Sequence, residues 1–215
     1  MAIRAQLTQE RSRLRREELL AAAIDLFAEG GARAITHRAV AARAGLPSAT
    51  TTYYFESIDE LIREALGAHV TRWSTELDAL ASVEMSTAVS LDDTAAFISS
   101  IFAARGPEVA ATELSIFLAA ARDPQLHDVA GAALRSIERL ADVLLAQVGV
   151  TDTSDVAAAM VALIAGTALR RQSGVYSEQD EARFLAGALR SLVAAHALGP
   201  EAVASAIASL DPATA

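Results

Sequence analysis

Cysteine and lysine are both absent from this chain of 215 residues. Without cysteine the protein cannot form disulfides or use a thiolate, and the sequence is compatible with a reducing compartment. Aromatic residues make up only 5% of the chain and never join β-branched residues in alternating runs, so we predict no β-strand. Alanine, the strongest helix former, occurs 50 times. This composition predicts an all-α fold.

The motifs of common enzyme classes are missing as well. The sequence contains no H-E-x-x-H, no Glu-x-x-His pair and no Gly-rich phosphate loop, and its four histidines are scattered. We therefore expect no metal and no cofactor. An all-α enzyme is kept as a remote alternative.

The chain also lacks a long apolar run. The uncharged stretch at 156–169 has 14 residues, which is too short to cross a bilayer. The first twenty residues, MAIRAQLTQERSRLRREELL, are charged throughout and do not resemble a secretory signal. We expect a cytoplasmic protein without a membrane partner.

The net charge of -9 disfavours nucleic acid, because phosphate binding requires positive charge. The charge is unevenly distributed, however. Residues 1–56 carry eight arginines against six acidic residues, whereas residues 57–215 carry ten against 21. All basic residues are arginine, which suits phosphate and guanine contacts but is equally explained by a GC-rich genome.

The first part of the chain predicts a scaffold helix and two short helices. Apolar residues at helical spacing predict a first helix at about 13–28, ended by two glycines. Thr36 is the expected N-cap of a second helix, with Ile35 and Val40 as a hydrophobic staple. That helix should end near Gly45, and a third should cover 48–54.

A longer helix and a series of further helices should follow. Ser57 and Glu60 form a capping box that opens a fourth helix, expected to reach Leu80. Beyond it we predict helices at 91–104, 107–122, 125–148, 154–173, 178–198 and 201–210. Two short helices joined by a glycine turn between a scaffold helix and a long helix are typical of a helix-turn-helix DNA-binding unit.

The run THRAVAARAGLPSATTTYYFESIDELIREAL at 36–66 resembles the signature of the tetracycline-repressor (TetR) family. In that family an Ala-Gly turn leads to a recognition helix ending in Tyr-x-Phe or Tyr-Phe. The resemblance covers about residues 13–66. It implies a helix-turn-helix DNA-binding domain with an Arg-rich N-terminal arm at 1–56, followed by a helical effector-binding and dimerisation domain at 57–215.

The third helix is the predicted reading element for the major groove, where base edges are distinguishable. Its short side chains permit close approach, and Ser48, Ala49 and Thr52 are the expected base contacts, with Thr50 on the same surface. The resemblance implies that Thr51 faces inward.

Phosphate contacts should set the register of the reading helix. Tyr53 resembles the family position that bonds a phosphate, and Thr36 and His37 lie at a helix N-terminus that can receive one. Arg38 and Arg43 are further candidates, although each is equally explained as a solvated charge. Packing of the ring in the small core is the alternative for Tyr53.

Several positions depart from the family pattern. Pro47 and Ser48 stand where many members have Ser and Lys, Ala49 stands for a frequent Gly, Thr52 for a frequent Tyr, and Ile58 for a Lys that reaches a phosphate. Fewer cationic contacts remain near the reading helix. A flexible arm is therefore expected to carry more of the binding, through Arg11, Arg13, Arg15 and Arg16.

The C-terminal domain should hold a small-molecule effector between its helices. The candidate contacts are His69, Trp73, Phe97, Ile101, Phe102, Phe117, His127 and Met160. Each is alternatively an ordinary core residue, but the two histidines would need polar partners if buried.

The last two long helices should form a homodimer, as the resemblance implies. The helix at 154–173 is apolar on both faces and must be covered on both sides. The candidate interface residues are Val156, Met160, Leu163, Ile164, Leu185, Leu189, Leu192 and Val193. An intrachain core is the alternative.

Together these features predict a ligand-responsive transcriptional regulator, in particular a repressor. It would bind a palindromic double-stranded DNA operator as a dimer and leave it when a small, partly apolar effector binds. The main alternative is a dimeric DNA-binding regulator or architectural protein without such an effector.

Overall fold

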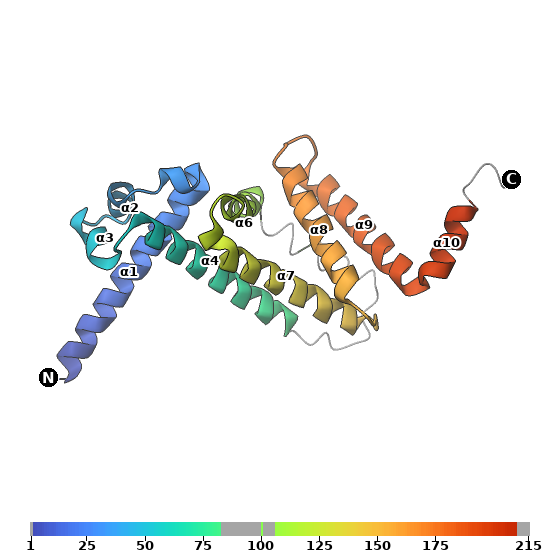
Figure 1. The fold of residues 1–215 in the computed structure, drawn as a ribbon, viewed down its shortest axis with the longest axis horizontal. Coiled ribbons are helices and arrows are strands. Elements are labelled where there is room, and N and C mark those ends of the chain that lie inside the picture. The colour runs from blue at the N-terminus through green and yellow to red at the C-terminus, as the bar shows by residue number, and fades with distance from the viewer. Residues whose placement is uncertain (1, 83–99, 101–105, 210–215) are drawn as a thin grey trace. The chain divides into compact units, whose positions relative to one another are not determined.

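The computed structural model describes residues 2–82, 100 and 106–209 (Figure 1). Every regular element in these ranges is a helix, as the composition predicts. The chain divides into two compact units, Met1–Glu76 with Thr112–Leu134, and Leu77–Ala111 with Arg135–Ala215. In the described ranges no single helix has the length and hydropathy of a membrane span, but α9 (Glu178–Leu198) and α10 (Pro200–Ala208), bent by 109°, meet that test as a pair.

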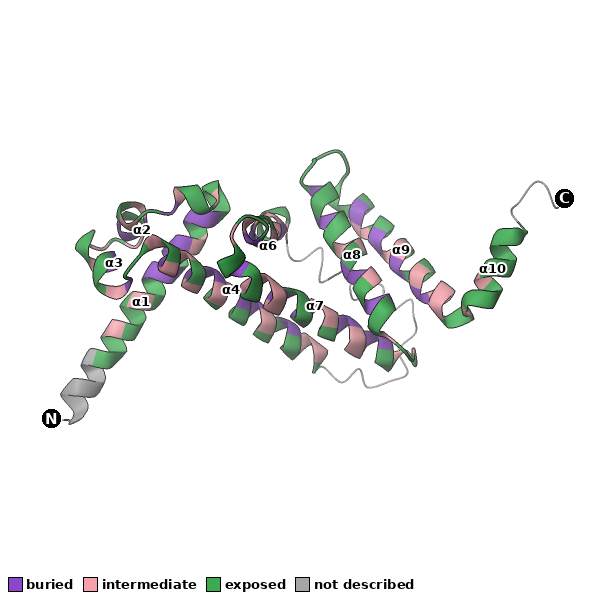
Figure 2. Ribbon diagram, in the orientation of Figure 1, coloured by how far each residue is buried: buried purple, intermediate pink, exposed green. Residues whose placement is uncertain are grey.

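The first unit is built on α1 (Ala2–Gly30), which is followed by α2 (His37–Arg43), α3 (Ala49–Tyr54) and the long α4 (Ile58–Ala81). Its core is formed by the apolar faces of these helices, where the buried residues of Figure 2 gather. The largest fully buried side chains there are Leu19, Phe27, Val40, Phe55, Leu61 and Leu66. The unit also contains most of α6 (Pro107–Ala120), the short η2 (Pro124–Leu126) and the start of α7 (His127–Gln147).

The predicted start signals of α2 and α4 are confirmed. The Thr36 hydroxyl accepts a hydrogen bond from the Ala39 N–H (3.1 Å), which satisfies one free donor of the first turn of α2. At α4 the Ser57 hydroxyl accepts from the Glu60 N–H (3.1 Å), and the Glu60 carboxylate accepts from the Glu56 N–H (2.6 Å). The side chain of Glu60 thus reaches back one residue further than the usual capping box does.

The first helix is longer than its apolar stripe predicts. It begins at Ala2 rather than near residue 13, so the arginines expected on a flexible arm lie on a continuous helix. This part of α1 has no glycine or proline, and Arg13 pairs with Glu10 (2.6 Å) and Glu17 (2.7 Å) along the helix surface. Such pairs stabilise a solvated helix that buries little apolar surface. Figure 1 shows this end of α1 extending past α2 and α3.

The second unit is centred on the antiparallel hairpin of α8 (Ser154–Arg171) and α9. Buried apolar residues from both helices face its interior. Near the turn Arg170 pairs with the buried Glu181 (3.1 Å), and the Arg170 guanidinium lies over the rings of Tyr176 (4.7 Å) and Phe184 (4.5 Å). The predicted helix at 91–104 lies outside the described residues, apart from residue 100, which is helical.

Candidate nucleic-acid interface

The turn between α2 and α3 fixes the direction of the third helix. Gly45 has φ of 67°, a left-handed conformation that costs a glycine little. Its N–H donates to the Ala42 carbonyl (3.2 Å), and the Leu46 N–H donates to the Ala41 carbonyl (2.8 Å). This pair of bonds is the Schellman arrangement, which ends α2 after two turns.

One side of α3 is anchored in the unit. Thr51 is fully buried, and its hydroxyl donates to the Ser48 carbonyl (2.9 Å), with the His37 carbonyl at 3.3 Å. Phe55, directly after the helix, is 2% exposed. The burial of Thr51 confirms the inward position that was predicted for this residue. Its hydroxyl has a hydrogen-bond partner in the protein and needs no water.

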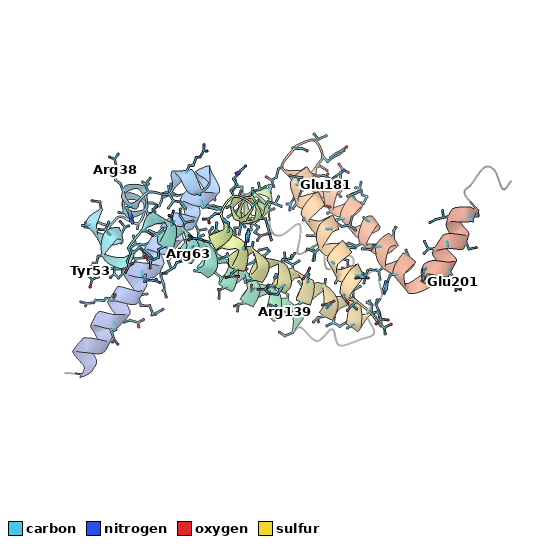
Figure 3. The ribbon with its side chains drawn as sticks, viewed as in Figure 1. Arg38, Tyr53, Arg63, Arg139, Glu181 and Glu201 are labelled. Carbon is cyan, nitrogen blue, oxygen red and sulfur yellow. The ribbon has the colours of Figure 1, made fainter. Side chains whose placement is uncertain are left out.

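The opposite side of α3 is open to solvent. Ser48, Ala49 and Thr52 are exposed, and the Tyr53 side chain is 81% exposed, while Thr50 is half-buried. The Tyr53 ring therefore does not pack in the core. It lies edge-to-face on Tyr54, with the ring centroids 5.0 Å apart. Figure 3 shows Tyr53 on α3 and Arg38 on α2, both at the outer edge of the unit.

Six arginines of α1 and α2 fall into two groups. Arg11, Arg15 and Arg38 are exposed and form no ion pair within the described ranges, so their guanidinium groups are available to an anion. Arg13, Arg16 and Arg43 are held by carboxylates.

Arg43 is the clearest of the engaged arginines. It donates to Glu29 (2.7 Å), and this hydrogen bond holds the pKa of the Glu29 carboxyl below its usual value. A phosphate would have to compete with that carboxylate. The Thr36 hydroxyl is likewise used by its own helix, and His37 is half-buried beside it.

Two family models match the sequence. The model for bacterial regulatory proteins of the tetR family matches residues 19–65, which include α2, α3 and the start of α4. The model for a tetracyclin repressor-like C-terminal domain matches residues 89–195. The chain belongs to the TetR family.

Solved structures support the TetR fold. SCO7518 from Streptomyces coelicolor A3(2), named as a transcriptional regulator, is 26% identical with a TM-score of 0.63, covering 84% of this chain and 99% of that one. The multidrug binding protein EbrR, complexed with proflavin, is 27% identical with a TM-score of 0.60, over 83% and 99%. A TetR-family protein from Mesorhizobium loti shares the fold at 16% identity, with a TM-score of 0.70 over 86% and 97%. A comparison with curated proteins found no match.

The expected effector contacts of this TetR-family chain have different surroundings. Trp73 and Met160 are buried, and His69 and Phe117 are half-buried. His127, at the junction of η2 and α7, is exposed, so its imidazole does not require a polar partner inside the protein. Three further candidates lie outside the described residues: Phe97, Ile101 and Phe102. The described residues contain no cluster of three or more potential metal ligands.

Most of the residues expected at the TetR-type dimer interface are instead buried inside their own chain. Five of them are at most 4% exposed, because α8 and α9 pack on each other and on their own unit: Val156, Met160, Leu185, Leu189 and Val193. The remaining three, Leu163, Ile164 and Leu192, are half-buried. Apolar periodicity identified the hairpin but not which of its apolar residues stay exposed.

Each helix of the hairpin also has an exposed stripe of uncharged residues at helical spacing, most of them small and three of them large and apolar. On α8 the stripe consists of Ala158, Ala162, Ala165 and Leu169, and on α9 of Phe184, Gly187, Ser191 and Leu198, all of them exposed. We call these eight residues the outer face. None of them is charged, and Leu169 is 65% and Leu198 69% exposed.

Proposed function

We propose that this TetR-family regulator acts in the cytoplasm as a repressor that binds a palindromic operator as a homodimer and is released by a small effector. The observation that carries the proposal is the two-sided environment of α3. Thr51 and Phe55 anchor one side, and the other side presents short polar side chains to solvent. A helix anchored in this way fits the major groove with its exposed side against the base edges.

The chemistry of the exposed side chains indicates which of them would contact bases and which would contact phosphates. The hydroxyls of Ser48 and Thr52 and the methyl group of Ala49 are short enough to touch bases. Arg11, Arg15 and Arg38 carry charges that no carboxylate in the described ranges neutralises, which suits phosphate contacts. Tyr53 offers a hydroxyl that donates a hydrogen bond to phosphate.

Two substitutions in α3 should have different consequences. Tyr53→Phe removes only a hydroxyl, so it should weaken binding to all DNA sequences by about tenfold or more, the scale of one hydrogen bond to a charged group. Thr52→Val should instead change which bases are preferred. Both are measured by sequencing the DNA that each variant selects from a random pool and then titrating single duplexes. A changed preference for Tyr53→Phe with unchanged affinity would reverse the assigned roles.

Dimerisation is proposed through the outer face. An exposed apolar surface without charges is typical of an interface between protein molecules. A two-fold axis at the outer face would bring two α8–α9 hairpins together as a four-helix arrangement. A dimer of this kind matches two recognition helices to the two halves of a palindrome.

A small, partly apolar effector is proposed to act through α4. This helix begins three residues after Phe55, and His69 and Trp73 lie further along it. EbrR, which is similar over most of this chain, has been solved with proflavin and with ethidium, both flat aromatic cations. An effector that favours badly spaced recognition helices would lower operator affinity, and DNA would weaken effector binding by the same factor.

Trp73 is the only tryptophan and reports on this event. Compounds of the proflavin type should change its fluorescence in DNA-free protein, and Trp73→Phe removes the signal without removing the α4 helix. A true effector should lower operator affinity by about 5- to 150-fold, the usual range of allosteric coupling. A compound that binds the free and the operator-bound dimer equally tightly would contradict the mechanism and favour a regulator without an effector.

A further inference from the structure

Three helices of the first unit meet at the side chain of Arg16. The Arg16 guanidinium, on α1, lies 5.1 Å from the centre of the Phe55 ring, which follows α3. One of its nitrogens donates to the carboxylate of Glu64 on α4. The two charged side chains are 39% and 31% exposed, so this ion pair is less hydrated than a fully exposed surface pair.

This contact acts on the end of the recognition helix. The Phe55 N–H donates to the Thr51 carbonyl (2.9 Å), so the position of the ring is tied to the last turn of α3. A guanidinium on the face of a buried ring is attracted by the ring electrons, and its bond to Glu64 is charge-assisted. Arg16 therefore contacts the end of α3 and the first turns of α4 together.

A second contact lies one turn away on α1. The Ser12 hydroxyl donates to the Tyr54 hydroxyl (3.3 Å), and residues 12 and 16 share one face of the helix. The same stripe of α1 thus holds the last residue of α3 and the phenylalanine that follows it. Arg11 and Arg15, in contrast, are exposed and form no ion pair in the part of the chain that the structure describes.

We propose that Arg16 is a positioning residue for DNA binding, which holds the end of the recognition helix against α4 and does not contact phosphate. The proposal rests on the proposed DNA-binding function and corrects the expectation that Arg16 belongs to a phosphate-binding arm. Glu64 is its partner in this role, although it is an acidic residue in a unit that binds a polyanion.

Whether Glu64→Gln raises or lowers the affinity for DNA distinguishes a positioning role of the Arg16–Glu64 pair from a general effect of charge. Glu64→Gln removes a negative charge, which by itself should strengthen binding to DNA. Positioning predicts the opposite, a loss of about tenfold, the scale of one charge-assisted hydrogen bond. Glu17→Gln is the matched control, because it removes an exposed carboxylate of α1 that also pairs with an arginine, Arg13. It should leave affinity unchanged or raise it.

The salt dependence of binding tests Arg16 itself. The affinity of each full-length variant for one duplex, selected by the wild-type protein from a random pool, is measured from low to high salt. Arg16→Gln should lose about tenfold at every salt concentration with an unchanged slope. Arg15→Gln should flatten the slope by about 0.9 for each phosphate that the variant no longer neutralises. Arg16→Lys keeps the cation and should recover most of the affinity, and thermal melting checks that each variant is folded.

The outcomes are distinct. A wild-type protein that binds no duplex overturns the proposed function and the positioning role with it. If the wild type binds and Arg16→Gln flattens the slope as Arg15→Gln does, Arg16 binds a phosphate and only the positioning role fails. The positioning role also fails if Arg16→Gln lowers the melting temperature while affinity at low temperature is unchanged, or if Glu64→Gln strengthens binding.

Discussion

Replacing Phe55 by alanine should cost about 3–5 kcal/mol of folding free energy and abolish operator binding. The side chain is 2% exposed, so its truncation leaves a cavity in the core. It also removes the ring over which the Arg16 guanidinium lies. Domains are stable by only about 5–15 kcal/mol, so the loss is a large part of the total. Thermal or urea unfolding followed by circular dichroism measures it directly.

Tyr53→Ala is the matched control for Phe55→Ala. Both residues are aromatic and lie at the end of the recognition helix, but the Tyr53 side chain is 81% exposed. Its truncation should therefore change the unfolding free energy by no more than about 0.5 kcal/mol, although it weakens DNA binding. Equal losses of stability for the two variants would mean that the end of α3 is not anchored as the structure has it.

Replacing Ala162 by glutamate should convert the proposed dimer to a monomer. Ala162 lies on the outer face, where the substitution would place a carboxylate against an apolar surface of the partner without a cation to pair with. Sedimentation velocity at micromolar concentration should show the mass of one chain. Operator affinity should fall by more than about tenfold, since each 1.4 kcal/mol of lost pairing is a factor of ten.

Ala197→Glu is the control for the dimer prediction. Ala197 is also an exposed alanine, but it lies on the side of α9 that carries Arg183 and Arg190, away from the outer face. This variant should remain a dimer. A dimer that tolerates Ala162→Glu, or a wild-type chain that is monomeric, would remove the outer face as the interface.

The local structure of the DNA-binding unit was predictable because its signals are short in range. Thr36 was predicted as the N-cap of α2, and its hydroxyl caps that helix in the structure. The residues that flank α9 predicted its bounds of 178–198, which the structure has. The burial of Thr51 was also predictable, but only from the family resemblance. Caps and turns act within about four residues, so a single sequence contains the information that determines them.

Other features depend on contacts between residues that are far apart in the sequence, and no local pattern reveals such contacts. Arg16 and Glu64 are 48 residues apart, and nothing near either residue indicates that they meet. The start of α1 was missed for a different reason. Its helix is supported by the pairs of Arg13 rather than by an apolar stripe, which was the feature used to define the helix.

The outer face illustrates the limit of apolar periodicity. The apolar positions that recur at helical spacing on α8 and α9 were correctly recognised. Five of the residues predicted for the dimer interface, however, pack inside their own chain. A helix that is apolar all round gives no sign of which side meets its own unit. Only the packing of the hairpin shows that Ala158, Ala162 and Ala165 stay exposed.

The most direct test of the central claim is the selection of double-stranded DNA from a random pool by the wild-type protein, followed by footprinting of the selected site. The account predicts a site with two-fold symmetry, whose half-sites are about one helical turn or more apart. In the same selection Thr52→Val should enrich a different base at the same position in both half-sites. Enrichment of no sequence, or protection of a site without two-fold symmetry, would contradict the proposal that a dimer reads an operator with α3.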